Sequence, residues 1–470
     1  MHRTEINPYL SGGFEPIRME CDCGWLEIEG ELPGGLDGTF YRAGPNPQFP
    51  PRGVYNPLQG DGMVHAFHVC GGRVSYRNRW VRTRRWLIER EAGRALFGTS
   101  GNPADCDPAV VGMATDGAAN TNVVWHGGRL LALEEGHAPI ELDPSTLETR
   151  GSFSFDGRLA RNMTAHPKSD PETGEMWLFA NMPGGGVSAE IALHAADTAG
   201  RLFRSERIEG PFPALIHDFA VTRDFVILPI FPVTVSLERL RAGGPPIAWE
   251  PDRGVHVAVI PRAGAHDARW FSAPTGMAWH VLNAFNEGTR ITLDLCLQEA
   301  AMFPAPDGAP PDERLATQRL TRWSWDWASD EPIMAEPLDD LRCEYPRIDD
   351  RRVGLRHRFG YAACLGGPGS GDPFHRGLAR FDLLTGERQV FSAGERCAVG
   401  EPVFVPARAD APEGEGFLLS CIFDERSGVS HLAVFDASNV GAGPVARAHL
   451  QHRVPMGFHA GWKPGAAHVA

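Results

Sequence analysis

Four histidines in this chain stand alone in short apolar segments, without a second metal-binding side chain beside them. They are His166, His217, His280 and His459. Histidine is the commonest protein ligand of transition metals, because its neutral ring offers a nitrogen lone pair. A single histidine in an apolar strand is more often an ordinary core or surface residue. Each position taken alone therefore leaves both interpretations open.

Three glutamates lie before or between these histidines, again in apolar or small-residue contexts: Glu135, Glu344 and Glu401. A buried carboxylate is costly unless paired, and the second nitrogen of a metal-bound imidazole usually needs an acceptor. In chain order the seven positions are separated by 31, 51, 63, 64, 57 and 58 residues. Such near-regular spacing is typical of a radial repeat fold, in which each blade sends a side chain to a shared axis. The set predicts one metal held by four imidazoles with carboxylate partners.

Four neutral imidazoles on an octahedral metal leave coordination positions open. This differs from closed tetrahedral structural zinc and from sites with two histidines and one carboxylate. Open positions on Fe(II) suit the activation of dioxygen. The pair Cys21 and Cys23 is a weaker metal candidate, because its spacing is one residue short and no second pair accompanies it.

The sequence predicts that many short strands position these residues. The 54 glycines and 39 prolines are spread along the whole chain and shorten its elements. We expect a helix over 86–97 and a helical turn over 236–241. The pattern favours a propeller, a double sandwich or tandem sandwiches. The spacing favours an all-β propeller formed by residues 1–470 as one domain. Seven blades would give about 67 residues each, but the spacing alone does not give the number of blades.

Composition excludes several functions. The net charge of -14, from 45 basic and 59 acidic residues, argues against a nucleic-acid partner. The first residues contain no apolar signal segment, and the apolar run over 225–235 is interrupted by prolines and too short to cross a bilayer. We expect that run to be a buried strand. Nine scattered cysteines fit reduced thiols and a cytoplasmic location.

The chain resembles the carotenoid cleavage oxygenases, whose relatives include stilbene- and phenylpropene-cleaving enzymes. The resemblance runs nearly end to end and rests on seven motifs in the family's order. These are Gly38-Thr-Phe-Tyr-Arg-Ala-Gly-Pro-Asn-Pro47, Gly60-Asp-Gly-Met-Val-His65, Ala119-Asn-Thr-Asn122, Ala165-His-Pro-Lys168, His217-Asp-Phe219, Glu401-Pro-Val-Phe-Val-Pro406 and Gly457-Phe-His459.

This resemblance implies a seven-bladed propeller with Fe(II) on its axis and a cap of helix and loops over the iron. It implies that the four histidines are the ligands, that the three glutamates support them and that His166 lacks a glutamate partner. It also places a methyl group of Thr121 near one open iron position. The implied reaction is cleavage of a carbon–carbon double bond by dioxygen to two carbonyl products.

The substrate implied by the resemblance is less defined. Phenol-cleaving relatives carry a tyrosine and a lysine where this chain has Ser100 and Glu134. An ionised Glu134 supplies neither a donor nor a cation to a phenolate. Other segments, such as 217–224, look like the phenylpropanoid-cleaving branch. We therefore expect a conjugated apolar alkene, a carotenoid or apocarotenoid, with the alternative of a stilbene or phenylpropanoid cleaved to an aromatic aldehyde.

Two other functions share the expected fold. One is a retinoid-isomerase-like enzyme, which uses the same iron site without cleavage. The other is a binding propeller without catalysis, in which the histidines are only structural. The expected partners are the alkene, dioxygen and, weakly, a membrane surface from which the substrate is taken up. The oligomeric state stays open.

Overall fold

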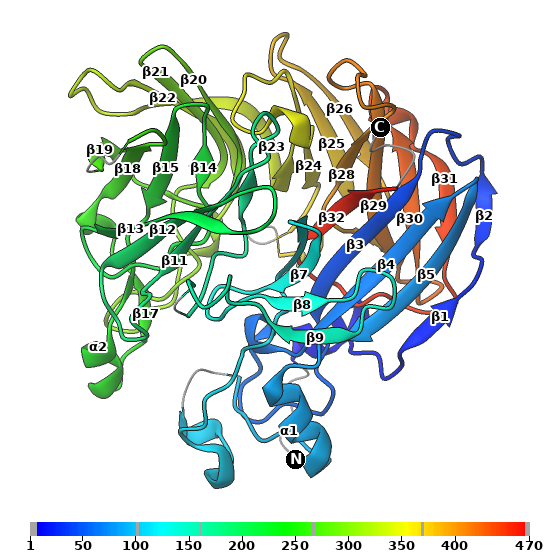
Figure 1. The fold of residues 1–470 in the computed structure, drawn as a ribbon, viewed down its shortest axis with the longest axis horizontal. Coiled ribbons are helices and arrows are strands. Elements are labelled where there is room, and N and C mark those ends of the chain that lie inside the picture. The colour runs from blue at the N-terminus through cyan, green and yellow to red at the C-terminus, as the bar shows by residue number, and fades with distance from the viewer. Residues whose placement is uncertain (1–6, 100–102, 160, 265–267, 368–370, 466–470) are drawn as a thin grey trace.

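The computed structural model describes residues 7–99, 103–159, 161–264, 268–367 and 371–465, and Figure 1 shows that strands dominate them. The strands form antiparallel sheets arranged around a central axis, and seven blades can be followed in these residues. This is the all-β propeller that the sequence predicts.

The bounds of the strands follow, blade by blade, beginning with the sheet that contains both ends of the chain. The first two blades are β1 (Cys21–Cys23), β5 (Arg73–Trp80), β4 (Gly62–Cys70), β3 (Gly38–Pro45) and β32 (Ala460–Pro464), then β6 (Asn122–His126), β7 (Arg129–Leu133), β8 (Ile140–Leu142) and β9 (Thr149–Ser152). The third and fourth are β10 (Lys168–Ser169), β11 (Met176–Asn181), β12 (Glu190–Ala196) and β13 (Leu202–Glu209), then β14 (Ala220–Val221), β15 (Phe225–Ile230), β18 (Val255–Pro261) and β19 (Arg269–Ala273).

The fifth and sixth blades share a long strand, β23 (Met334–Arg347), whose two halves pair with different neighbours. The fifth also contains β20 (Met277–Glu287), β21 (Arg290–Gln298) and β22 (Arg319–Asp326), and the sixth β24 (Phe359–Cys364), β25 (Gly377–Asp382) and β26 (Glu387–Ser392). The seventh contains β27 (Cys397–Val399), β28 (Val403–Pro406), β29 (Gly416–Asp424), β30 (Val429–Asp436), β31 (Pro444–His449) and β2 (Glu27–Gly30). A separate pair, β16 (Val233–Val235) and β17 (Ile247–Trp249), lies outside the blades.

The ring is held by hydrophobic clusters between neighbouring blades. Each of the seven largest clusters joins side chains of two adjacent blades, so that together they pass once around the axis. Between the third and fourth blades, for example, the rings of Phe179 and Phe219 lie 5.3 Å apart, edge to face. Full burial of such a side chain contributes roughly 1.5–3 kcal/mol. Packing therefore fixes the blades against each other, and the fifth and sixth blades are also joined through the shared strand β23.

Both ends of the chain close the ring. Strand β32, the last described strand, pairs with β3 in the first blade, and β2, which precedes β3 in the chain, pairs with β31 in the seventh. Closure by two pairings ties the last described residues to the first.

The two predicted helical segments are present, and one differs in its bounds. Helix α1 spans Arg84–Ala92, so it begins and ends earlier than the sequence pattern indicates. Thr83 caps its start, and Gly93 ends it at a positive φ of 68° that favours glycine. Helix α2 spans Leu237–Arg241 behind the N-cap Ser236, as expected. The helix α1 and its loops project from one side of the ring in Figure 1.

The apolar run over 225–235 is buried, as expected, and forms β15 and β16. Among the described residues, none of the helices combines the length and the apolar character needed to cross a bilayer.

Candidate metal centre

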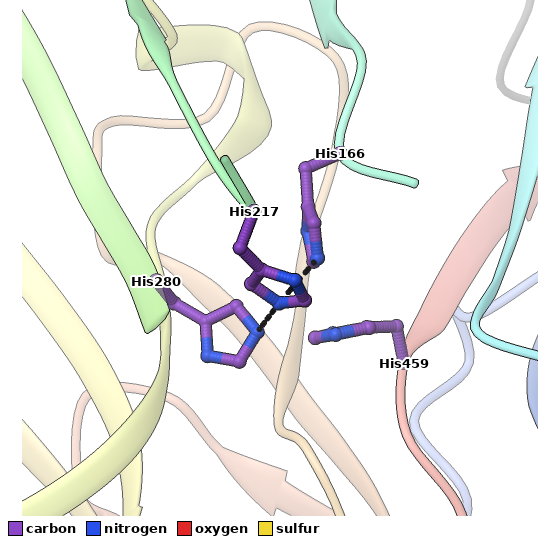
Figure 2. Close-up of side chains that lie close together, drawn as sticks. All are labelled: His166, His217, His280 and His459. Carbon is purple, nitrogen blue, oxygen red and sulfur yellow. Dashed lines mark hydrogen bonds between the residues drawn. The ribbon is translucent and has the colours of Figure 1, made fainter. Parts of the chain in front are cut away.

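The four isolated histidines meet at the centre of the ring. Figure 2 shows their rings pointing toward one another from separate segments, and one nitrogen of each lies within 4.8 Å of the others. The Nε2 atom of His217 lies 3.1 Å from Nε2 of His166 and 3.1 Å from Nε2 of His280. Segments up to about 300 residues apart thus place their imidazoles as the regular spacing predicts.

Three of the imidazoles have a carboxylate on the ring nitrogen that faces away from the cluster. Nδ1 of His280 lies 2.5 Å from Oε2 of Glu344, and Nδ1 of His459 lies 3.1 Å from Oε1 of Glu401. Nδ1 of His217 contacts Oε1 of Glu135. A carboxylate on Nδ1 holds the proton there and leaves the lone pair of Nε2 facing the centre.

Burial and the carboxylates act on these groups in opposite directions. Burial by itself would lower the pKa of His280, but the Glu344 carboxylate outweighs it and raises the pKa of His280 above its usual value. Burial would raise the pKa of Glu401, yet His459 and the Arg347 guanidinium lower the pKa of Glu401 to about 2. The carboxylate of Glu401 is therefore ionised at neutral pH and available to an imidazole N–H.

His166 has no carboxylate partner, as the resemblance implies. Its backbone N–H donates to Oγ1 of Thr164 at 3.0 Å, and the side chain is buried. Burial, followed by the three neighbouring imidazoles, holds the pKa of His166 well below its usual value. This imidazole is neutral and can donate a lone pair.

Thr121 lies beside the cluster and is tied to one of its members. The backbone N–H of His459 donates to the carbonyl of Thr121 at 3.1 Å. The Thr121 hydroxyl donates to Oδ1 of Asn120 at 3.0 Å, so its polar group is already engaged.

A cavity of about 460 Å³ extends along the axis from one side of the cluster. Its walls include His166, His280, Glu401 and His459 and, in six segments, residues that follow the candidate site residues. These are residues 122–125, 167–169, 218, 220–221, 281–284, 346–348 and 460–464. The cavity therefore reaches three of the four histidines.

Aromatic side chains that are not part of the cavity wall lie close to the cluster. Trp279 stands edge-on to the ring of His217 at 4.9 Å and lies 5.9 Å from Phe303. Tyr345 packs on His280 at 5.5 Å and on His459 at 5.4 Å. Phe219 is buried in a cluster between two blades, and Phe285 is buried against His357.

Glu134 directly precedes Glu135 in the chain and has two partners. It accepts the backbone N–H of Ala118 at 2.9 Å, three residues before Thr121. Its other oxygen contacts Nδ1 of His137, whose side chain is 28% exposed. Glu134 is therefore half of a carboxylate–imidazole pair. Ser100 lies outside the described residues.

The sequence did not single out three charged side chains that surround the cluster. Lys168 and Asp218 lie inside two of the quoted motifs and form an ion pair of 2.7 Å between Nζ and Oδ1. Arg347 donates from Nη1 to the carbonyl of Ala460 at 2.9 Å and lies 3.4 Å from Oε2 of Glu401. For Lys168 and Asp218 the available signal was their place in motifs next to the ligand candidates, whereas Arg347 lies in none of the quoted motifs.

Comparisons with known proteins agree with this geometry. The family described as retinal pigment epithelial membrane protein matches residues 14–464. An isoeugenol monooxygenase of Pseudomonas putida is 38% identical, over 97% of this chain and 98% of that protein. The solved lignostilbene dioxygenase of Pseudomonas brassicacearum is 37% identical with a TM-score of 0.92, covering 98% of this chain and 99% of that one. A Synechocystis apocarotenoid oxygenase variant is 28% identical with a TM-score of 0.85, covering 96% and 98%.

A propeller with four histidines on its axis, matched over nearly its whole length by oxygenases, defines an oxidoreductase. The chain belongs to the carotenoid cleavage oxygenase family, as the motifs predict. The predicted activity, cleavage of an alkene by a dioxygenase, is confirmed at this level.

Proposed function

We propose that His166, His217, His280 and His459 bind one Fe(II) ion and that the protein uses it to cleave an arylalkene of the stilbene or phenylpropene type. The observation that carries the metal assignment is the convergence of four imidazole nitrogens within 4.8 Å. The donor set fits the metal, because neutral imidazoles suit iron and three outer carboxylates balance the charge of a divalent cation. When bound, Fe(II) supplies the activation of dioxygen.

The side chains around the cluster define what the protein itself contributes. Glu135, Glu344 and Glu401 keep three imidazoles oriented. Because the hydroxyl of Thr121 is engaged by Asn120, its methyl group is left to narrow the space beside the histidines. Trp279 and Tyr345 exclude water from the face on which the alkene lies. We assign residues 1–470 to one oxygenase domain, with α1 and its loops as the substrate cap.

Two observations support an arylalkene. The relatives named for isoeugenol and lignostilbene are 37–38% identical to this chain, whereas the apocarotenoid oxygenase variant is 28% identical. The pair of Glu134 and His137 provides a polar acceptor in the segment that carries Glu135. An acceptor suits the hydroxyl of a neutral phenol, which donates a hydrogen bond, better than it suits a phenolate.

One observation favours the second candidate, a carotenoid or apocarotenoid. Glu134 stands where phenol-cleaving relatives are expected to carry a lysine, so a cation for a phenolate is missing at this position. A long polyene without a phenol needs no such cation.

Incubation with Fe(II), ¹⁸O₂ and a panel of stilbenes, propenylphenols and apocarotenoids tests the reaction and the substrate together. We expect labelled carbonyl products from the arylalkenes, with one labelled oxygen in each product, read by mass spectrometry. Exclusive turnover of apocarotenoids would overturn the substrate proposal and leave the cleavage intact. Isomerised but uncleaved substrate would favour the isomerase-like alternative.

Metal analysis tests the site itself. Purified protein is expected to contain about one iron per chain, or to take up Fe(II) in that ratio without oxygen. If the protein had no affinity for Fe(II), both iron-dependent functions would be excluded, and a non-catalytic binding propeller would be the remaining interpretation.

A weak contact with a membrane surface is part of the proposal. Large apolar side chains are exposed on α1 and on the loops beside it, at Val54, Leu58, Leu87, Val111 and Met113. Apolar substrates partition into bilayers, and exposed apolar groups near an entrance favour their uptake.

The variant Glu344→Gln should keep the metal and lose part of its activity. An outer hydrogen-bond partner tunes a ligand, and its loss typically costs roughly 10- to 100-fold in affinity or activity. Because Glu344 raises the pKa of His280, the variant should also lower that pKa. NMR titration of the metal-free protein, followed at the His280 ring, measures the shift. Wild-type turnover together with an unchanged titration would remove the role of Glu344.

A further inference from the structure

Asp218 is a buried carboxylate with a neighbour on three different inner segments. It is 6% exposed and directly follows His217. Its Oδ2 accepts the backbone N–H of Val281 at 2.8 Å, and its Oδ1 lies 2.7 Å from Nζ of Lys168. Oδ1 also accepts the N–H of Phe219 at 2.8 Å. One cation and two N–H groups satisfy a carboxylate that would otherwise be costly to bury.

Each partner of Asp218 is next to a different member of the histidine cluster. Lys168 is two residues after His166, and Val281 directly follows His280. The three segments belong to the third, fourth and fifth blades, whose strands β10, β14 and β20 lie in separate sheets. Asp218 therefore links three blades that no β-ladder joins at this point. Each of its contacts lies within two residues of one of the three imidazoles.

The fourth imidazole is held by an analogous contact on the opposite part of the ring. Oε2 of Glu401 accepts the backbone N–H of Ala460 at 2.6 Å, directly after His459. Asp218 differs from Glu401 because it touches none of the four imidazoles through a hydrogen bond among the described contacts. It lines the axial cavity, whose wall does not include Trp279.

We propose that Asp218, with Lys168, is a positioning residue that fixes the mutual placement of His166, His217 and His280 and thereby sets the metal affinity of the cluster. This rests on the proposed function, because it requires these histidines to bind the metal. A site whose ligands come from separate blades depends on such supports, since small displacements of a ligand weaken coordination.

The test is titration of metal-free protein with Co(II), followed by visible absorption, which reports both affinity and coordination geometry. The variant Asp218→Asn should bind Co(II) about 10- to 100-fold more weakly and with an altered spectrum. Lys168→Gln, which removes the cation, should weaken Co(II) binding. Lys168→Arg, which keeps the cation, should bind Co(II) as the wild-type protein does. Lys168 is 19% exposed in its side chain, so these two variants keep the test open if Asp218→Asn does not fold.

Asp382→Asn is the matched control. Asp382 is also buried, at 5% exposed, and pairs with Arg358 through two contacts of 2.9 and 2.6 Å in the sixth blade. Its variant should lose thermal stability and keep the Co(II) affinity. Wild-type affinity and spectrum in Asp218→Asn, or an equal loss in Asp382→Asn, would overturn the inference. A wild-type protein that binds neither Co(II) nor Fe(II) would instead remove the proposed function.

Discussion

His280→Ala should reduce metal affinity by more than about 100-fold, beyond the range typical for loss of an outer partner, and abolish turnover. The substitution removes one of four nitrogens and leaves Glu344 buried without its imidazole. Iron content after anaerobic loading, measured beside turnover, checks both effects. Because an unpaired buried carboxylate also destabilises the fold, the double variant His280→Ala/Glu344→Gln is measured in parallel.

A buried histidine elsewhere gives the control for this experiment. His194 on β12 is 6% exposed and lies 2.8 Å from Oγ of Ser205. His194→Ala removes the same group from a comparable environment outside the cluster, so it should retain iron. Full iron loading of both His280 variants would contradict the assignment of His280 as a ligand.

Glu134→Gln should lower kcat/KM for a 4-hydroxyarylalkene about 100-fold, in the range typical of losing a positioned proton acceptor. The amide oxygen still accepts the N–H of Ala118, so the local backbone keeps its contact. The lost charge is the one that pairs with His137 and, in our proposal, receives the phenol hydroxyl. The matching 4-methoxy compound, which donates no hydrogen bond, should be cleaved at its wild-type rate.

The contrast between the two substrates separates recognition from folding. Equal losses for the hydroxy and methoxy compounds would indicate a structural effect of Glu134. No loss for either would show that the pair does not touch the substrate. Glu141→Gln is a suitable control, because that carboxylate is also partly buried and pairs with Arg129 and Arg150 on the second blade.

The ligand candidates could be predicted from sequence because their spacing along the chain and their apolar neighbours can be seen without a structure. Spacing and apolar context identified His280 without a local motif, and the structure brings it to within 3.1 Å of His217. The resemblance implied that the glutamates support the histidines and that His166 has no such partner, but which glutamate contacts which histidine became known only from the structure. The strand-rich composition likewise fixed the class of fold.

Contacts between blades could not be predicted in the same way. Asp218 meets Val281 across 63 residues, and nothing in either segment specifies that meeting. The direction of Glu134, toward Ala118 and His137, depends on how the chain turns before the second blade. The end of α1 was misplaced because a glycine that stops a helix through positive φ, Gly93, also occurs inside helical patterns.

The closing strand gives this enzyme an order of assembly. β32 begins at Ala460, the residue after His459, and pairs with β3 near the start of the chain. During synthesis, six blades and three imidazoles are made before this last segment leaves the ribosome. His459, which supplies the fourth imidazole nitrogen, and β32, which completes the ring of blades, are therefore synthesised together. Binding of the proposed metal by all four histidines therefore requires the strand pairing that completes the ring.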